Sequence, residues 1–208
     1  QLLDRLEGGL ARLGAALLRV LRGLRPNSRG ASRRNIAAHY DLGNELFRVF
    51  LDRNLMYSSA IFRDEAEPLE VASERKLERI CAKLGLRPGM RVVEIGTGWG
   101  GFALHAASRH GVHVTTTTIS REQHELATAR VREAGLEQHV TLLMRDYRDL
   151  EGRYDRLVSI EMIEAIGPQY LETYFAKASS LLEPDGMGLV QAITIEDHRY
   201  AQALRNVD

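Results

Sequence analysis

The spacing of hydrophobic positions divides this chain into two parts. In residues 2–24 hydrophobic side chains recur every three or four positions, which predicts an apolar stripe on an amphipathic helix. The stripe consists of Leu3, Leu6, Leu10, Leu13, Leu17, Val20 and Leu24. The next stretch, RPNSRGAS, combines proline, glycine and serines and is predicted to be a linker. We therefore expect a helical segment with its linker over residues 1–34 and a separate domain over residues 35–208.

From Arg91 onward, strand-like and helix-like patterns alternate. Strands are predicted at residues 91–96, 113–120, 139–146, the first part of 154–164, and 187–195. Helices are predicted at residues 100–110, 121–135 and 168–186, the last ending in a Pro-Asp-Gly turn. This alternation is typical of an α/β fold with a parallel, doubly wound sheet. Such sheets bind ligands at the carboxyl ends of their strands, so the residues that follow each strand are expected to converge.

The stretch VVEIGTGWGG, residues 92–101, is typical of a nucleotide-binding turn between a strand and a helix. A P-loop is excluded because no Gly-Lys-Ser or Gly-Lys-Thr follows. The dinucleotide pattern G-x-G-x-x-G is met through Gly101, but Trp99 is bulky where a pyrophosphate needs close packing. Glu94, inside the strand, could act through ordered groups on the cationic end of a methionine moiety. The pattern therefore favours S-adenosylmethionine, and a glycine-rich turn without a ligand is the plain alternative.

Composition adds little except at the N-terminus. The single cysteine, Cys81, cannot form an internal disulfide or a cysteine zinc site; it reads as a helix core position and fits a reducing compartment. No metal is expected, and no apolar run approaches the roughly 20 residues that a membrane span needs.

The net charge is zero, but the stretch from Gly8 to Tyr40 has seven arginines and no acid. They are Arg12, Arg19, Arg22, Arg25, Arg29, Arg33 and Arg34. This arm would be attracted to an anionic membrane surface or to nucleic acid, and a solvated linker is the alternative.

Seven blocks of the sequence resemble the cyclopropane-fatty-acyl-phospholipid synthase family, which includes the mycolic acid cyclopropane synthases and related fatty-acid methyltransferases. The blocks are HYDLGNELFRVFLD, MYSSAIF, KLERICAKLGLRPGMRVVEIGTGWGG, TTISREQ, RDYRDL, YDRLVSIEMIEAIG and YFAKASSLLEPDG. The match runs from about His39 to Ile195. It implies a Rossmann-like class I methyltransferase sheet, S-adenosyl-L-methionine as cofactor, and the cis double bond of an unsaturated phospholipid acyl chain as methyl acceptor.

The resemblance also implies which residues contact the cofactor. Besides Glu94, they are Tyr40, Gly96, Gly98, Gly100, Thr118, Ile119, Gln123, Tyr147 and Arg148. Gln123 has the amide groups to bind ribose hydroxyls, and Tyr147 offers an aromatic face beside an adenine. For Tyr147 taken alone, a half-buried surface tyrosine is the plain alternative.

The implied reaction needs a base. Methylation of the alkene leaves a carbocation, and loss of a proton then gives either a cyclopropane or a methylene branch. Family enzymes hold a bicarbonate ion as base through a cysteine in a Y-S-C-A block, a glutamate in an F-E-H block and a histidine at the end of the fifth strand. The corresponding positions here are Ser59, Glu164 and Gln191.

These candidate catalytic residues depart from the family pattern. The cysteine is replaced by Ser59, the histidine beside Glu164 by Ala165, and the strand-five histidine by Gln191. The three candidates could still bind an anion, and Glu164 could accept a proton. For Glu161 and Glu164 a capping or solvated acid is the alternative. The departures favour an enzyme that forms a methylene or methyl branch nearly as much as a cyclopropane synthase.

Three other expectations concern the whole protein. Family sheets normally have seven strands, so the chain is expected to be incomplete at the C-terminus, and Gln1 suggests a missing upstream segment. The apolar stripe of residues 2–24 is expected to pack against another domain, a membrane surface or a second subunit in a homodimer. We expect a cytoplasmic enzyme that contacts membranes peripherally.

Two other classes of function compete with this one. A non-catalytic cofactor- or lipid-binding module would fit the loss of the family base, and a nicotinamide-dependent enzyme would fit the glycine spacing. Methylation of nucleic acid is disfavoured because no Asn-Pro-Pro-Tyr-like or Pro-Cys block is present to hold a flipped base.

Overall fold

The computed structural model describes residues 44–203, which fall into two compact units. The larger unit extends through Ala192 and contains a five-stranded sheet. The described part of the other unit begins at Ile193 and contains helix α8 (Asp197–Ala203). Tyr40, the arginine-rich stretch and the helix predicted over residues 2–24 lie outside the described residues. Between residues 44 and 203, no helix has both the length and the apolar character needed to cross a membrane.

The sheet is entirely parallel, with the strand order β3-β2-β1-β4-β5. Its strands are β1 (Arg91–Ile95), β2 (His113–Thr118), β3 (Val140–Met144), β4 (Tyr154–Ile160) and β5 (Leu182–Gln191). The strand order reverses between the paired strands β1 and β4. In sheets of this kind, such a switch point is where ligands bind. The predicted α/β fold with a doubly wound parallel sheet is confirmed.

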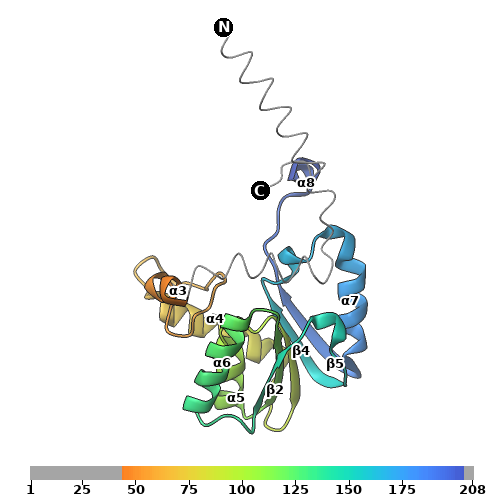
Figure 1. Ribbon diagram of the computed structural model, residues 1–208. Coiled ribbons are helices and arrows are strands. Elements are labelled where there is room, and N and C mark those ends of the chain that lie inside the picture. The colour runs from red at the N-terminus through yellow and green to blue at the C-terminus, as the bar shows by residue number, and fades with distance from the viewer. Residues whose placement is uncertain (1–43, 204–208) are drawn as a thin grey trace. The chain divides into compact units, whose positions relative to one another are not determined.

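Helices cover both faces of the sheet (Figure 1). One face carries α4 (Leu69–Leu84), α5 (Gly101–His110) and α6 (Arg121–Glu133), and the other carries α7 (Leu171–Ser180). Alternating side chains of β1 serve the two cores, because Val92 packs with α4 and α5 whereas Val93 packs with α7. The shorter elements are α3 (Asn44–Phe50), η1 (Tyr147–Asp149), η2 (Ile163–Ala165) and η3 (Pro168–Tyr170).

The fifth strand differs from its prediction. It begins at Leu182 and ends at Gln191, whereas the pattern predicted a turn at Pro184, Asp185 and Gly186 and a strand over residues 187–195. The register with β4 jumps from the pair Tyr154–Leu182 to the pair Arg156–Met187. Because proline cannot donate to a strand ladder, the Pro-Asp-Gly stretch is accommodated as an irregularity inside the strand and not as a turn before it.

Candidate active site

The glycine loop joins β1 to α5 at the switch point. Gly96, Gly98 and Gly100 all have positive φ angles, of 98°, 52° and 86°, which other L-residues rarely adopt. The backbone N–H of Gly96 and that of Thr97 both donate to the carbonyl of Thr117, at 3.2 and 2.9 Å, and this ties the loop to the end of β2. The loop is therefore held in one conformation with no side chain at three of its positions.

The fourth glycine has a packing role. A Cβ atom at Gly101 would lie 2.4 Å from Sδ of Met56 and 2.7 Å from the carbonyl oxygen of Asn54. The side chain of Trp99 is also buried, packed against Phe47 with 4.6 Å between ring centroids. Gly101, the third glycine of the dinucleotide-like spacing, is therefore explained by the close approach of residues 54–56, and no pyrophosphate is needed to account for it.

A buried chain of polar side chains runs from β1 to this loop. The carboxyl group of Glu94 is 2% exposed and accepts a hydrogen bond from Oγ1 of Thr116 at 2.6 Å. Oγ1 of Thr116 lies in turn 2.5 Å from Oγ1 of Thr97, inside the loop. Burial raises the pKa of Glu94 to about 8, and the Thr116 hydrogen bond opposes this rise. The two hydroxyls are the kind of ordered group through which Glu94 was predicted to act.

The end of β2 holds the next predicted residues. Oγ1 of Thr118 donates to Oε1 of Gln123 at 2.8 Å, and Ser120 caps α6 by accepting from the backbone N–H of Gln123 at 3.2 Å. Gln123 is buried, and Ile119 is half-buried beside it in sequence. With its carbonyl oxygen engaged by Thr118, the group that Gln123 can offer to a ligand is its amide nitrogen.

The end of β3 holds Tyr147 and Arg148. Asp146 is buried and accepts from Nε and Nη2 of Arg148, at 2.8 and 2.6 Å. The guanidinium carbon of Arg148 lies 5.7 Å from the ring centroid of Tyr147, and Tyr147 packs edge-on against Tyr174 at 5.5 Å. Both predicted side chains are therefore held in place, and burial raises the pKa of the Tyr147 hydroxyl.

Two of the three catalytic candidates, Ser59 and Gln191, meet at the carboxylate of Glu161. The backbone N–H and the hydroxyl of Ser59 both donate to Oε1 of Glu161, each at 2.9 Å. Nε2 of Gln191 donates to the same oxygen at 2.7 Å and to Oγ of Ser59 at 3.0 Å. Glu164 is exposed within η2, three residues farther along. Its predicted role stays a prediction, whereas Glu161 is the acid that lies with Ser59 and Gln191.

Glu161 has a strained backbone. Its φ angle is +47°, one of two positive values among the non-glycine residues that the structure describes, and such a conformation costs about 1 kcal/mol or more. Its backbone N–H donates to the carbonyl of Gln191 at 2.8 Å. A Cβ at Gly96 would lie 3.1 Å from Cγ of Met162, so the glycine loop and the Glu161 segment are neighbours.

A buried lysine accompanies this cluster and was missed by the sequence analysis. Lys76, in α4, is 2% exposed and donates to Oγ of Ser58 at 2.5 Å. Burial lowers its pKa to about 8, and the negative charges of Glu161 and Asp52 oppose the shift. The available signal was its place between Ala72 and Ile80, where a lysine interrupts the apolar stripe of an amphipathic helix.

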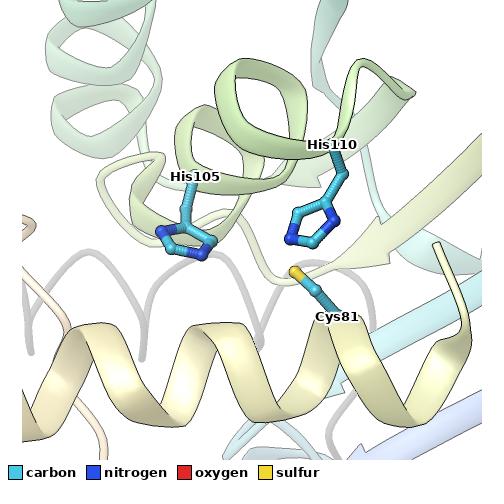
Figure 2. A group of neighbouring side chains, drawn as sticks. All are labelled: Cys81, His105 and His110. Carbon is cyan, nitrogen blue, oxygen red and sulfur yellow. The ribbon is translucent and has the colours of Figure 1, made fainter. Parts of the chain in front are cut away.

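Away from the switch point, α4 and α5 bring Cys81, His105 and His110 together (Figure 2). Their potential metal-ligating atoms lie within 4.8 Å of one another, although no site involving the single cysteine was expected. Burial raises the pKa of the Cys81 thiol to about 12, and Oε2 of Glu78 lies 3.2 Å from Nε2 of each histidine. Cys81 belongs to the hydrophobic core cluster between α4 and α5, and Glu78 is hydrogen-bonded to both rings, so we assign this group to the α4–α5 interface.

The fold and the residues at its switch point define a class I methyltransferase. The family model described as mycolic acid cyclopropane synthetase matches residues 27–207. The chain therefore belongs to the mycolic acid cyclopropane synthetase family, as its sequence blocks predicted.

Two curated relatives have names that refer to different lipid products. Tuberculostearic acid methyltransferase UfaA1 of Mycobacterium tuberculosis is 46% identical over 83% of this chain. Cyclopropane-fatty-acyl-phospholipid synthase of Escherichia coli is 48% identical over 74% of it. The chain covers 42% and 39% of their respective lengths.

Solved structures agree with the fold. The cyclopropane synthase MmaA2 from Mycobacterium tuberculosis matches with a TM-score of 0.77 at 32% identity, over 85% of this chain and 62% of that one. Mycolic acid cyclopropane synthase CmaA1, solved with SAH and CTAB, matches with a TM-score of 0.73 at 32% identity, over 76% of this chain and 55% of that one.

Proposed function

We propose that this chain is the cofactor-binding part of an enzyme that transfers a methyl group from S-adenosyl-L-methionine to a cis double bond in an unsaturated phospholipid acyl chain. The observation that carries this proposal is the contact between two sets of residues at the β1–β4 switch point. One set is the glycine loop with its Glu94–Thr116–Thr97 chain, and the other is the cluster around Glu161. The first suits a cofactor, and the second suits chemistry on a neighbouring substrate.

The residues at the strand ends fit the cofactor. Positive φ angles in the loop allow a ligand to approach the backbone closely, and the buried hydroxyls of Thr97 and Thr116 connect that position to an acid. The amide nitrogen of Gln123 would donate to ribose hydroxyls, and Tyr147 would offer its ring to an adenine. The structure of CmaA1 with SAH, the demethylated form of this cofactor, supports the choice. When bound, S-adenosyl-L-methionine supplies an electrophilic methyl group.

The protein's contribution to methyl transfer is chiefly positioning. An alkene is a weak nucleophile, so the residues must hold it in line with the methyl group and keep water away from the carbocation that follows. Tyr57 and Phe62, on either side of Ser59 in sequence, expose 50% and 49% of their surface. These aromatic side chains would provide apolar surface for an acyl chain, and the ring of Tyr57 extends that surface to Phe47 and Phe50.

The proposed product is a cyclopropane, as in the E. coli relative's name. A methylene or methyl branch is the second candidate, and it is favoured by the similarity to UfaA1, whose name refers to tuberculostearic acid and which covers more of this chain at nearly the same identity. The cyclopropane and the methylene branch arise after the same methyl transfer. Proton loss from the new methyl group closes the ring directly, whereas a 1,2-hydride shift that moves the cation to the methyl-bearing carbon, followed by proton loss from the methyl group, gives the methylene; a methyl branch needs a later reduction of that methylene.

The full-length protein that contains this chain tests the proposal. It would be incubated with methyl-labelled S-adenosyl-L-methionine and vesicles of dioleoyl phosphatidylglycerol, and the acyl chains analysed by mass spectrometry before and after ozonolysis. We expect a mass gain of one methylene group; resistance to ozone identifies a cyclopropane and cleavage at the branch carbon a methylene. If no labelled methyl group appears in the lipid although SAH binding is measurable, the result would instead indicate a cofactor- or lipid-binding module.

A further inference from the structure

The cluster at the ends of β4 and β5 has the form of an anion site whose anion is part of the chain. Three donor groups converge on one oxygen, Oε1 of Glu161: the backbone N–H of Ser59, the hydroxyl of Ser59 and the amide of Gln191. All three distances lie between 2.7 and 2.9 Å, within the range of strong hydrogen bonds to a carboxylate. These contacts join residues that are 102 and 30 positions apart in the sequence.

A separate bicarbonate ion does not fit this arrangement. The family resemblance places such an ion at Ser59 and at the residue that ends the fifth strand, which is Gln191. Here the donors of both residues are directed to Glu161, and a bicarbonate among them would lie against the Glu161 carboxylate. The donors that would hold a separate ion are already engaged by Glu161, so no donor of Ser59 or Gln191 is left to compensate a second negative charge.

We propose that the Glu161 carboxylate takes the place of the bicarbonate ion and is the base that removes the proton from the methylated acyl chain. This inference rests on the methyl transfer proposed above. It names Glu161 as a catalytic residue of this chain and assigns Ser59 and Gln191 to positioning it.

The proposed step is balanced without a further reactant. The π electrons of the alkene form a bond to the methyl carbon, the bond from that carbon to sulfur breaks, and an adjacent chain carbon becomes cationic. Glu161 then takes a proton from the new methyl group. The freed C–H electron pair either closes the ring or, after a 1,2-hydride shift has moved the cation to the methyl-bearing carbon, forms the methylene double bond. The products are a neutral acyl chain, S-adenosylhomocysteine and protonated Glu161, which returns its proton to water.

The surroundings of Glu161 suit this role. The donors gather on Oε1, and within residues 44–203 no hydrogen bond to Oε2 is found, which leaves Oε2 to accept the proton. Lys76 is buried close enough for its positive charge to interact with the negative charge of Glu161. The positive φ of Glu161 points the same way, because backbone strain at a non-glycine residue is retained where the surrounding contacts require that side chain.

The test compares variants of the full-length protein in ordinary buffer and in CO2-free buffer. Glu161→Gln keeps the side-chain shape but removes the base, so kcat for lipid methylation should fall roughly 100-fold or more while SAH affinity stays within about twofold. The wild type should be equally active with and without bicarbonate. Glu172→Gln, an exposed acid on α7, is the matched control and should keep wild-type activity.

A second variant asks whether Glu161 really takes the anion's place. Glu161→Gly suits the positive φ and opens the position, so added bicarbonate or formate should restore part of its activity. An active wild type that loses activity in CO2-free buffer, or an active Glu161→Gln variant, would overturn the inference and leave methyl transfer standing. A wild type that methylates no lipid would overturn the proposed function itself.

Discussion

Two buried ionisable residues, Glu94 and Lys76, dominate the electrostatics at the residue scale. Burial is the main cause of both pKa shifts, raising the pKa of Glu94 and lowering that of Lys76, each to about 8. Within residues 44–203 neither lies in an ion pair: Glu94 accepts from a threonine hydroxyl and Lys76 donates to a serine hydroxyl. Burying ionisable groups in this way reduces stability, and proteins retain them chiefly where function requires them.

The raised pKa of Glu94 makes stability depend on pH. Between about pH 4.5 and 8 the folded protein keeps a proton on Glu94 that the unfolded chain has lost, so the free energy of unfolding should fall as pH rises through this window. In the wild type this decrease in the free energy of unfolding should amount to a few kcal/mol, on the order that a pKa shift of this size implies. In the Glu94→Gln variant the decrease should be absent. Urea unfolding at half-unit pH steps measures it. An identical pH profile for the variant would show that Glu94 is not the titrating group.

Lys76 should make stability depend on pH with the opposite sign, and at higher pH. Its lowered pKa means that above about pH 8 the folded protein loses a proton that the unfolded chain keeps up to about 10.5, so this residue makes stability rise between those values. Lys76→Met should abolish that rise in the same unfolding experiment. A rise that persists in the variant would assign it to another group.

At the scale of elements, the pairing of α4 with α5 sets one wall of the domain. Cys81 is fully buried between the two helices, among apolar residues that include Leu77 and Phe102. The histidines at the edge of this interface are held by Glu78. The interface therefore combines a dry centre with a polar border, and the thiol belongs to the dry centre.

Cys81→Ala tests the packing assignment. The substitution leaves a small cavity and should lower the free energy of unfolding by about 1 kcal/mol, because lost burial and an unfilled space both contribute. The loss should be equal with added Zn²⁺ and with a chelator, measured by chemical denaturation. A Zn²⁺-dependent increase in the stability of the wild type that disappears in the variant would instead make Cys81, His105 and His110 a metal site.

At the scale of the whole molecule, the substrate proposed above is part of a membrane, which the enzyme would have to reach. The sequence places seven arginines and no acid between residues 8 and 40, outside the described residues, while the chain as a whole is neutral. A segment with that balance is attracted to anionic lipid over distances of roughly a Debye length, about 10 Å at 0.1 M salt.

Neutralising Arg33 and Arg34 tests this attraction. With both changed to glutamine, methylation of anionic vesicles should fall by up to about 30-fold at low salt, at about 1 kcal/mol of surface attraction per charge, and approach the wild-type rate at high salt. Neutral phosphatidylcholine vesicles are the matched control and should show no difference. Equal rates on anionic vesicles at every salt concentration would mean that these arginines do not steer the enzyme to the membrane.

The order of strands and helices, the glycine loop and the family could be read from the sequence, because periodicity, glycine and capping residues act over short stretches of chain. The β5 irregularity could not, since it depends on the register with β4. The partner of Ser59 and Gln191 was also decided by the tertiary structure. The family resemblance pointed to Glu164, and Glu161 lies only three residues before it, but the backbone turn after β4 directs Glu161 to Ser59 across 102 residues. Contacts between residues so far apart in the sequence depend on where the strand ends lie relative to one another in the folded sheet, and the local sequence does not specify this.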